Sequence, residues 1–152
     1  MRLTRYTDYC LRVLIYLGLK QGRLATIQEV SEHYGISRNH LMKVVFELNR
    51  NGYIETQRGK NGGMRLGRRP AEVRLGELVR RCEPDLDLVE CFSDGDTCRI
   101  AAACRLKAVL GTALGAFLEE LDRYSLADLL QPESQLVELL DMRRTPDRSP
   151  RG

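Results

Sequence analysis

The feature that most constrains the fold lies between residues 26 and 66, where two helical patterns precede two short alternating segments. Thr26 and Glu29 have the spacing of a capping box, which predicts a helix beginning after Thr26. Gly35 is expected to end this helix, and Ser37 to cap a second one. The buried stripe of the second helix would consist of Leu41, Val44, Val45 and Leu48. Two helices joined by a short glycine-containing turn indicate a helix-turn-helix.

The segments that follow predict a β-hairpin. Residues 53–57 and 64–66 alternate as short strands do, and between them lies the basic, glycine-rich run RGKNGG at residues 58–63. Such a loop can also cradle a nucleotide phosphate, but the Lys-Ser/Thr pair and the helix of a P-loop do not follow it. We therefore predict a mainly α protein with a winged helix-turn-helix DNA-binding domain at residues 1–81, in which the hairpin is a small β wing.

The exposed side of the second helix and the wing carry side chains that suit double-stranded DNA. Asn presents the paired donor and acceptor that match adenine, Arg and Lys meet phosphates, and a glycine-rich backbone can approach a duplex closely. The alternative interpretation is an ordinary helical hairpin with a solvated charged face. The candidate DNA contacts are Thr26, Ser37, Arg38, Asn39, His40, Lys43, Arg58, Gly59, Lys60 and Asn61.

Charge is distributed unevenly along the 152 residues. Residues 1–81 contain 16 Lys and Arg against 7 Asp and Glu, whereas residues 82–152 contain 8 against 14, so the halves carry +9 and −6. A basic first half suggests a polyanionic partner for that half alone, and a solvated charged surface is the simpler alternative. The apolar run at residues 13–19 keeps helical phase with its flanks, and no cleavage site follows it. With five cysteines, an odd number, we expect reduced thiols in a cytoplasmic protein without a membrane span.

A first amphipathic helix is predicted over residues 4–20. Cys10 lies on its apolar face, where a free cysteine behaves as a small core hydrophobe. Asp8 lies on another side, three residues from Arg5 and four from Arg12, the spacing of a surface ion pair.

Three cysteines, Cys91, Cys98 and Cys104, lie within fourteen residues. The polar run between the first two contains Gly95 and two acids, so we expect a loop. Three thiols on one loop suggest a metal, but these spacings match neither the Cys-x-x-Cys pairs of zinc sites nor the runs of ferredoxins. The spacing leaves the identity of the metal open.

A long helix is predicted after Cys104, with an apolar stripe from Leu106 to Leu121 that is too long for so small a domain to cover. We expect it to pair with the same helix of a second chain in a homodimer. A capped helix beginning at Ser125 is expected to return onto the long helix, and a last helix to span residues 136–142. The predicted divisions are a cysteine-rich loop at 82–104, dimerisation helices at 105–130 and a partly disordered tail at 131–152.

Several of these segments together resemble one family. They are residues 3–9 (LTRYTDY), the wing at 58–63, the three cysteines, residues 104–107 (CRLK) and residues 121–129 (LDRYSLADL). Over residues 1–130 the chain resembles the iron–sulfur winged-helix transcriptional regulators, and among them the nitric-oxide-sensing repressors. The sister group of cluster-assembly regulators has a histidine three residues after its third cysteine. Lys107 occupies that position here, and an ammonium group cannot act as a ligand.

The resemblance implies a dimeric repressor in which Cys91, Cys98 and Cys104 hold an iron–sulfur cluster. It also implies that Asp8 of the other subunit is the fourth ligand, with Cys10, Cys82 and His40 as further candidates. The intact cluster would permit promoter binding, and nitric oxide, as the signal, would end it and release detoxification genes from repression. Both [2Fe–2S] and [4Fe–4S] clusters can use these thiolates, so the resemblance leaves the cluster type open.

Two other classes of function fit parts of the same pattern. Zinc or thiol chemistry at the cysteines could control the same DNA-binding domain, and visible absorbance would distinguish it because zinc is colourless. An iron–sulfur electron-transfer protein or enzyme is the third class. The sequence contains no substrate-pocket motif, and a recognition helix and basic wing would then lack a purpose, so we do not predict an enzyme.

Overall fold

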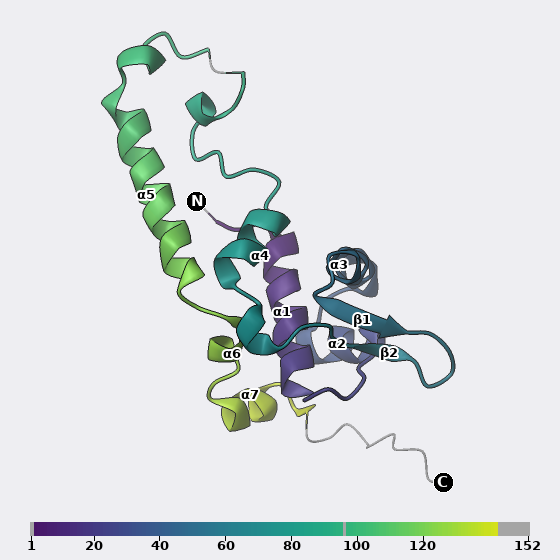
Figure 1. Cartoon of the computed structure of the whole chain (residues 1–152). Coiled ribbons are helices and arrows are strands. Elements are labelled where there is room, and N and C mark those ends of the chain that lie inside the picture. Colours follow the sequence, from purple (N-terminus) through teal and green to yellow (C-terminus); the bar gives the residue numbers. More distant parts are fainter. Residues whose placement is uncertain (1, 96, 143–152) are drawn as a thin grey trace.

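The computed structural model describes residues 2–95 and 97–142, which form a mainly helical fold with one two-stranded hairpin (Figure 1). The N-terminal elements are α1 (Arg5–Leu19), α2 (Ile27–Tyr34), α3 (Arg38–Arg50), β1 (Ile54–Gln57), β2 (Gly63–Leu66), the 3-10 turn η1 (Pro70–Glu72) and α4 (Leu75–Cys82). The C-terminal elements are η2 (Glu90–Phe92), η3 (Ala101–Ala103), α5 (Arg105–Asp122), α6 (Leu126–Leu129) and α7 (Glu133–Leu139). The predicted fold class is confirmed.

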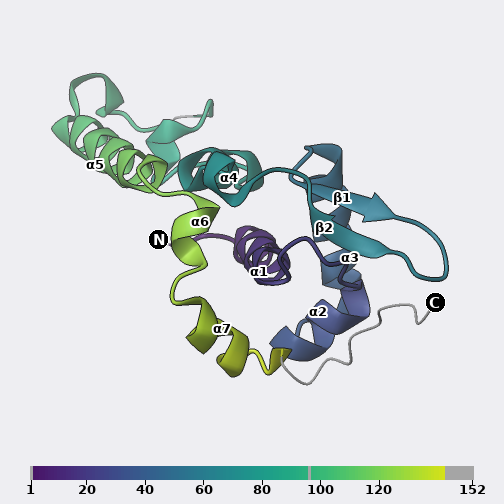
Figure 2. The ribbon, with the colours of Figure 1, turned by 60° about the horizontal axis from the view of Figure 1, so that its bottom comes forward.

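The helix α1 is the centre of the N-terminal domain, with α2, α3, α4, α6 and α7 arranged around it (Figure 2). Thr4 caps its start, because the hydroxyl oxygen accepts a hydrogen bond from the backbone N–H of Thr7 at 3.3 Å. Its buried side chains include Val13, Leu14 and Cys10, which is 0% exposed. The prediction that Cys10 is a core residue is therefore confirmed.

The helix-turn-helix forms as the sequence predicts. Thr26 and Glu29 make the capping box of α2, and Gly35 ends this helix in the left-handed conformation with φ 65°. Ser37 caps α3 by accepting from the N–H of His40 at 3.3 Å. The four apolar residues expected to form the buried stripe of α3 are all buried, so the opposite side of the helix faces solvent.

The wing is an antiparallel pair in which Ile54 lies opposite Leu66 and Gln57 opposite Gly63. A second attachment holds it to the chain before α2, because Ala25 and Met64 exchange backbone hydrogen bonds of 2.9 and 2.8 Å. Glycine is required at Gly62, where a Cβ atom would lie 2.2 Å from the carbonyl oxygen of Gln57. The wing therefore projects beside α3 from a fixed base (Figure 1).

The helix α5 extends away from the N-terminal domain and contacts it through α4 (Figure 1). None of the described side chains between residues 83 and 124 is buried within this chain. An 18-residue helix that buries no side chain has little intrinsic stability, because packing of an apolar face normally stabilises a helix.

The prediction for the helix after Ser125 is wrong in one respect. The capping box at Ser125 and Asp128 is present, but α6 packs against η1 and α1 instead of returning onto α5. Leu126 is buried in the N-terminal core, and its N–H donates to the carbonyl oxygen of Val73 at 2.8 Å. This backbone pairing, made between residues far apart in sequence, draws the chain back to the first domain.

The last helix, α7, begins at Glu133 and ends at Leu139, so it starts and ends three residues earlier than predicted. The predicted disorder of the tail concerns mainly residues 143–152, which lie outside the described residues. Among the described helices, none is long and apolar enough to cross a membrane.

Candidate nucleic-acid interface and metal centre

The predicted DNA contacts lie on the exposed side of α3 and on the wing. All ten are exposed to solvent, and they come from the cap of α2, the first two turns of α3 and the tip of the hairpin. Gly59 at that tip has a φ of 109°, which other residues rarely adopt, so the glycine is needed for the turn itself. The candidates Arg58, Gly59, Lys60 and Asn61 all belong to this connection between β1 and β2.

Four cations of this surface have no partner among the described residues, whereas neighbouring cations form ion pairs. Within residues 2–95 and 97–142, no hydrogen bond or ion pair engages the side chains of four cations, which we call the interface cations: Arg38, Lys43, Arg58 and Lys60. By contrast, Arg50 at the end of α3 pairs with Glu47 at 2.8 Å, and Arg65 of β2 pairs with Glu55 at 3.2 Å. The interface cations are therefore available to an external anion.

The position of Arg38 reinforces this difference. Arg38 is the first residue of α3, and no acidic residue lies in the first turn of that helix. A cation at a helix N-terminus opposes the helix dipole and costs roughly 0.3–1 kcal/mol. Arg38 therefore does not stabilise the helix, and its placement suits an anion bound at the helix start.

Three of the predicted contacts also have structural roles. Thr26 accepts from the N–H of Glu29 at 3.1 Å, and Ser37 caps α3. The Oγ atom of Ser37 also lies 3.1 Å from Nδ1 of His40, which orients the imidazole on the exposed side. Contact between DNA and any of these residues remains a prediction.

A buried polar cluster holds α2, and so the helix-turn-helix, against α1. One carboxylate oxygen of Glu29 accepts from the Tyr16 hydroxyl at 2.8 Å and from the Lys20 ammonium at 2.6 Å. Burial alone would raise the pKa of Glu29. Hydrogen bonds from Lys20 and Tyr16 outweigh this effect, so the pKa lies below its ordinary value of 4.5. The cluster fixes the start of α2.

Arg68 fixes the other end of the recognition helix. Its guanidinium donates to the carbonyl oxygens of Asn51 at 2.9 Å and Gly52 at 3.2 Å, just beyond the last turn of α3. The same group stacks over the Tyr53 ring, 4.4 Å from its centroid. A cation at this end also suits the helix dipole.

The sequence analysis missed three residues of this surface. Met42 and Phe46 are 55% and 63% exposed on α3, although both are apolar. Their signal was present, because they lie four residues apart and outside the buried stripe of the helix. Arg5, on the neighbouring helix α1, has no comparable signal in its spacing.

The three cysteines lie on the segment that leads to α5, Cys91 in η2 and Cys104 directly before the helix. Cys98 is exposed, and Cys91 and Cys104 are half-buried. Among the described residues, none of the five cysteines forms a disulfide. In the described part of the chain, no three His, Cys, Asp or Glu side chains lie close enough together to hold a metal ion. The structure therefore does not bring these thiols together in a single chain.

The donor set nevertheless fits an iron–sulfur cluster. Thiolates are the ligands of such clusters, and these three lie on a loop whose described side chains are not buried, so a core does not restrain them. Zinc has the same preference for thiolates. The chemistry of the loop supports a metal centre without choosing between these metals.

Asp8 forms an ion pair on its own helix. Its carboxylate lies 2.9 Å from the Arg12 guanidinium, and the side chain is 46% exposed. Arg12 also lies 5.8 Å from the centroid of the Tyr34 ring. The ion pair expected from the sequence is confirmed, and ligation of a partner's cluster stays a prediction.

The other ligand candidates lie elsewhere. The neighbouring Cys82 thiol and burial together raise the pKa of the Cys10 thiol. The Cys10 thiol in turn lowers the pKa of Cys82. A protonated thiol in the core is a poor ligand, and His40 belongs to the exposed side of α3.

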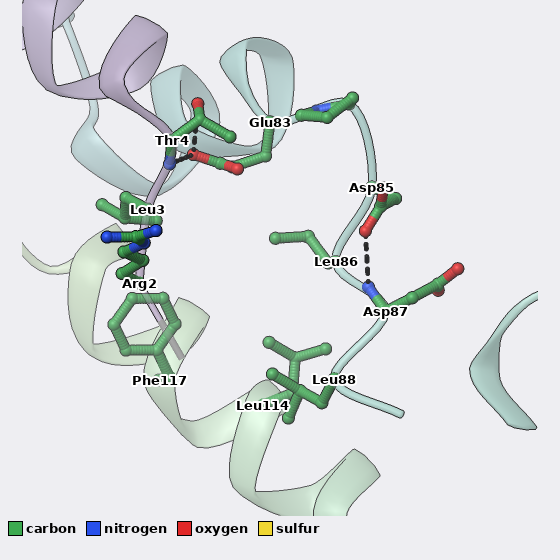
Figure 3. A pocket seen from close by; sticks show the side chains of 11 residues that line it. Arg2, Leu3, Thr4, Glu83, Asp85, Leu86, Asp87, Leu88, Leu114 and Phe117 are labelled. Atoms are coloured by element: carbon green, nitrogen blue, oxygen red, sulfur yellow. Dashed lines mark hydrogen bonds between the residues drawn. The ribbon is translucent and has the colours of Figure 1, made fainter. Parts of the chain in front are cut away.

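A hollow of about 490 Å³ separates the N-terminus from α5 and the loop (Figure 3). It is lined by residues 2–4, residues 83–88 and the α5 side chains Leu114 and Phe117. At its rim one Glu83 carboxylate oxygen accepts from the backbone N–H of Thr4 at 2.8 Å and from its hydroxyl at 3.1 Å. The segment leading to the cysteines is thereby tied to the cap of α1.

Comparison with known proteins gives a consistent result. A family described as "Rrf2: Iron-dependent Transcriptional regulator" matches residues 3–132. The chain is 48% identical over 145 residues to the HTH-type transcriptional regulator NsrR of Bacillus subtilis (strain 168), across 94% of this chain and 99% of that relative. It is 49% identical over 146 residues to the NsrR of Geobacillus kaustophilus, across 95% and 99% of the two chains.

Solved structures show the same fold. T. potens IscR superimposes with a TM-score of 0.69 at 21% identity and covers 90% of each chain. CymR, the global cysteine regulator of B. subtilis, superimposes with a TM-score of 0.68 at 24% identity, over 85% of this chain and 95% of that one. At these identities the similarity concerns the fold alone.

Proposed function

Because the chain belongs to the Rrf2 family of iron-dependent transcriptional regulators, we propose that it is a nitric-oxide-sensing repressor. It binds promoter DNA as a homodimer while an iron–sulfur cluster is intact, and nitrosylation of the cluster ends repression of nitric-oxide detoxification genes. The names of the relatives at 48% and 49% identity support this choice within the family.

The observation that carries DNA binding is the partnerless state, within the described residues, of the interface cations on α3 and the wing. A phosphate backbone would supply the missing anions and orient the protein, while Asn39, exposed in the first turn of α3, would meet base edges in the major groove. The wing tip, with two cations and a glycine at φ 109°, suits the adjacent minor groove or its phosphates.

The exposed stripe of α5 supports a homodimer. Leu106 and Val109 are large apolar residues that face solvent in one chain, and Ala113 and Ala116 continue the same side of the helix. A second copy of α5 would bury this stripe and hold two α3 helices at a spacing that fits adjacent half-sites.

Cys91, Cys98 and Cys104 would hold the cluster, and Asp8 of the partner subunit would complete it. A bound cluster with one carboxylate ligand supplies an exchangeable iron that nitric oxide can reach. Cys104 directly precedes α5, so a change in its ligation acts on the helix that is proposed to pair the subunits.

An anaerobic titration tests the proposal. The purified protein is expected to be a brown dimer that binds a palindromic promoter fragment and releases it as nitric oxide is added, and its native mass gives the cluster type. Cys98→Ser should lose the colour, whereas Cys10→Ala should keep it. A colourless zinc protein, or DNA binding that ignores nitric oxide, would refute the signal while leaving the DNA-binding domain intact.

The interface cations are tested separately with a matched pair on one helix. Lys43→Gln is expected to weaken binding to every duplex, because a phosphate contact is independent of sequence. Arg50→Gln removes the same charge from a residue that is already paired with Glu47, and it should have little effect. Equal effects of the two changes would remove the basis for placing DNA on this side of α3.

A further inference from the structure

A second hollow, of about 210 Å³, lies between the start of α1 and the exposed side of α3. It belongs neither to the cysteine loop nor to the wing. Its wall is mostly apolar, but two cationic side chains open onto it and no carboxylate contributes to it. The lining residues are Arg5, Tyr6, Tyr9, Asn39, His40, Lys43 and Val44.

The charge of this hollow is left uncompensated. In the part of the chain that the structure describes, neither Arg5 nor Lys43 has an ion-pair partner. The acids nearest in sequence are engaged elsewhere, since Asp8 pairs with Arg12 and Glu47 pairs with Arg50. Two cations from different helices thus share one concave site.

Arg5 also lies at a position where its charge does not stabilise the fold. It is the first residue of α1, where a cation opposes the helix dipole, and its side chain is exposed. The aromatic side of the hollow is ordered, because the rings of Tyr9 and His40 lie 6.0 Å apart and Ser37 contacts the imidazole. The site is therefore built from both helices.

We infer that this hollow binds one phosphate of the DNA backbone, with Arg5 of α1 and Lys43 of α3 as its two cationic contacts. The inference rests on the proposed function. Phosphate oxygens accept several charge-assisted hydrogen bonds at once, which suits a cluster of donors without a carboxylate. The hollow adjoins the first turns of α3, so the phosphate would flank the groove that this helix enters.

The inference extends the DNA-binding surface to α1. Arg5 lies three residues before Asp8, the predicted ligand of the partner's cluster, on the same helix. One rigid helix would then contact both the DNA backbone and the cluster of the other subunit. This arrangement gives a direct structural connection between the two sites.

The test uses a labelled mixed-sequence duplex of about 30 base pairs and measures the dissociation constant of the intact dimer against salt concentration. Arg5→Gln is expected to raise Kd roughly tenfold and to make the salt slope about two units shallower, one per subunit. Its thermal stability should be unchanged or slightly higher, and Arg5→Lys should recover most of the slope. Arg123→Gln removes an equal charge from a residue paired with Glu120 on the far end of α5, and it should bind as the wild type does.

Two results separate failure of this inference from failure of the proposed function. If Arg5→Gln binds the duplex like Arg123→Gln while Lys43→Gln is weakened, the hollow holds no DNA phosphate and the proposed function stands. A hollow that binds only free phosphate ions would also leave the duplex affinity of Arg5→Gln unchanged, and it would equally contradict the inference. If the wild type shows no salt-dependent binding to any duplex, both are wrong.

Discussion

The N-terminal domain and the segment from residue 83 to residue 122 obtain their order in different ways. The first buries a continuous apolar core around α1, to which α6 contributes Leu126. The second contains the cysteines and α5, and none of its described side chains is buried in one chain. The first region therefore has a core of its own, whereas we expect the second to be ordered by what it binds.

This difference suits a sensor. A domain with its own core presents α3 and the wing in a fixed geometry, so its affinity for DNA is set in advance. A segment ordered by a metal centre and a partner helix can change its structure when either is lost. In the proposed function, signal and readout would belong to regions of different stability, which are joined at the contact between Glu83 and Thr4.

The largest expected effect comes from truncating a leucine in each of the two regions. Leu14→Ala should lower the free energy of unfolding by roughly 3 kcal/mol, because Leu14 is fully buried and a cavity would remain. Leu106→Ala truncates a residue that is 59% exposed in α5, and in dilute protein it should cost less than about 0.5 kcal/mol. Urea denaturation at low protein concentration measures both. If the two variants lose similar free energies of unfolding, the two regions do not differ in how they are stabilised.

The second prediction concerns the proposed partner of α5. Val109→Asp should weaken dimerisation about a hundredfold, because a carboxylate would be buried in the interface without a partner. The unfolding of the monomer should not change. Ser134→Asp adds the same charge on α7 and serves as the control in sedimentation experiments. A dimer that tolerates Val109→Asp would place the interface elsewhere.

A smaller effect is expected where the regions join. Glu83→Ala removes two hydrogen bonds to Thr4 at the cap of α1, and it should cost about 1–2 kcal/mol because both groups are partly exposed. Asp87→Ala, in the same segment, removes an exposed carboxylate and should be neutral. Thermal denaturation of the two variants gives the comparison. If they are equally stable, the joint contributes nothing to the N-terminal domain.

The smallest effect is a dependence of the first region on pH. The pKa of Glu29 is lower in the folded protein than its ordinary value of 4.5, so the folded state binds fewer protons in this range. The stabilisation is complete above about pH 4.5 and is lost as pH falls through the folded pKa. In Glu29→Gln the free energy of unfolding should fall less on acidification, by on the order of 1 kcal/mol. Urea denaturation from about pH 6 to about pH 3 measures this difference. If the variant and the wild type lose equal stability at acid pH, the acid sensitivity comes from other carboxyl groups.

Local signals were sufficient to predict the helix-turn-helix and its wing. The capping box at Thr26, the left-handed Gly35 and the basic hairpin each depend on residues close in sequence. The position of α6 was not predictable in this way, because it depends on the pairing of Leu126 with the distant Val73. The hollow beside Arg5 likewise forms only where two separate helices meet.

The cysteine loop shows a different limit. Its residue types indicate a metal centre, and in the proposed function the positions of the three thiols would be set by the cluster and by the second chain. In the described part of the chain the three thiols do not lie together, whereas the exposed side chains of α3 follow directly from the phase of its buried stripe.

Hydrogen exchange of the cluster-free and cluster-loaded protein tests the central claim most directly. We predict that backbone amides of residues 85–104 exchange rapidly without the cluster and gain strong protection when it is bound, while those of α1 and α3 are equally protected in both forms. Protection of residues 85–104 equal to that of α3 in the cluster-free protein would contradict the account, because this segment would then have order of its own.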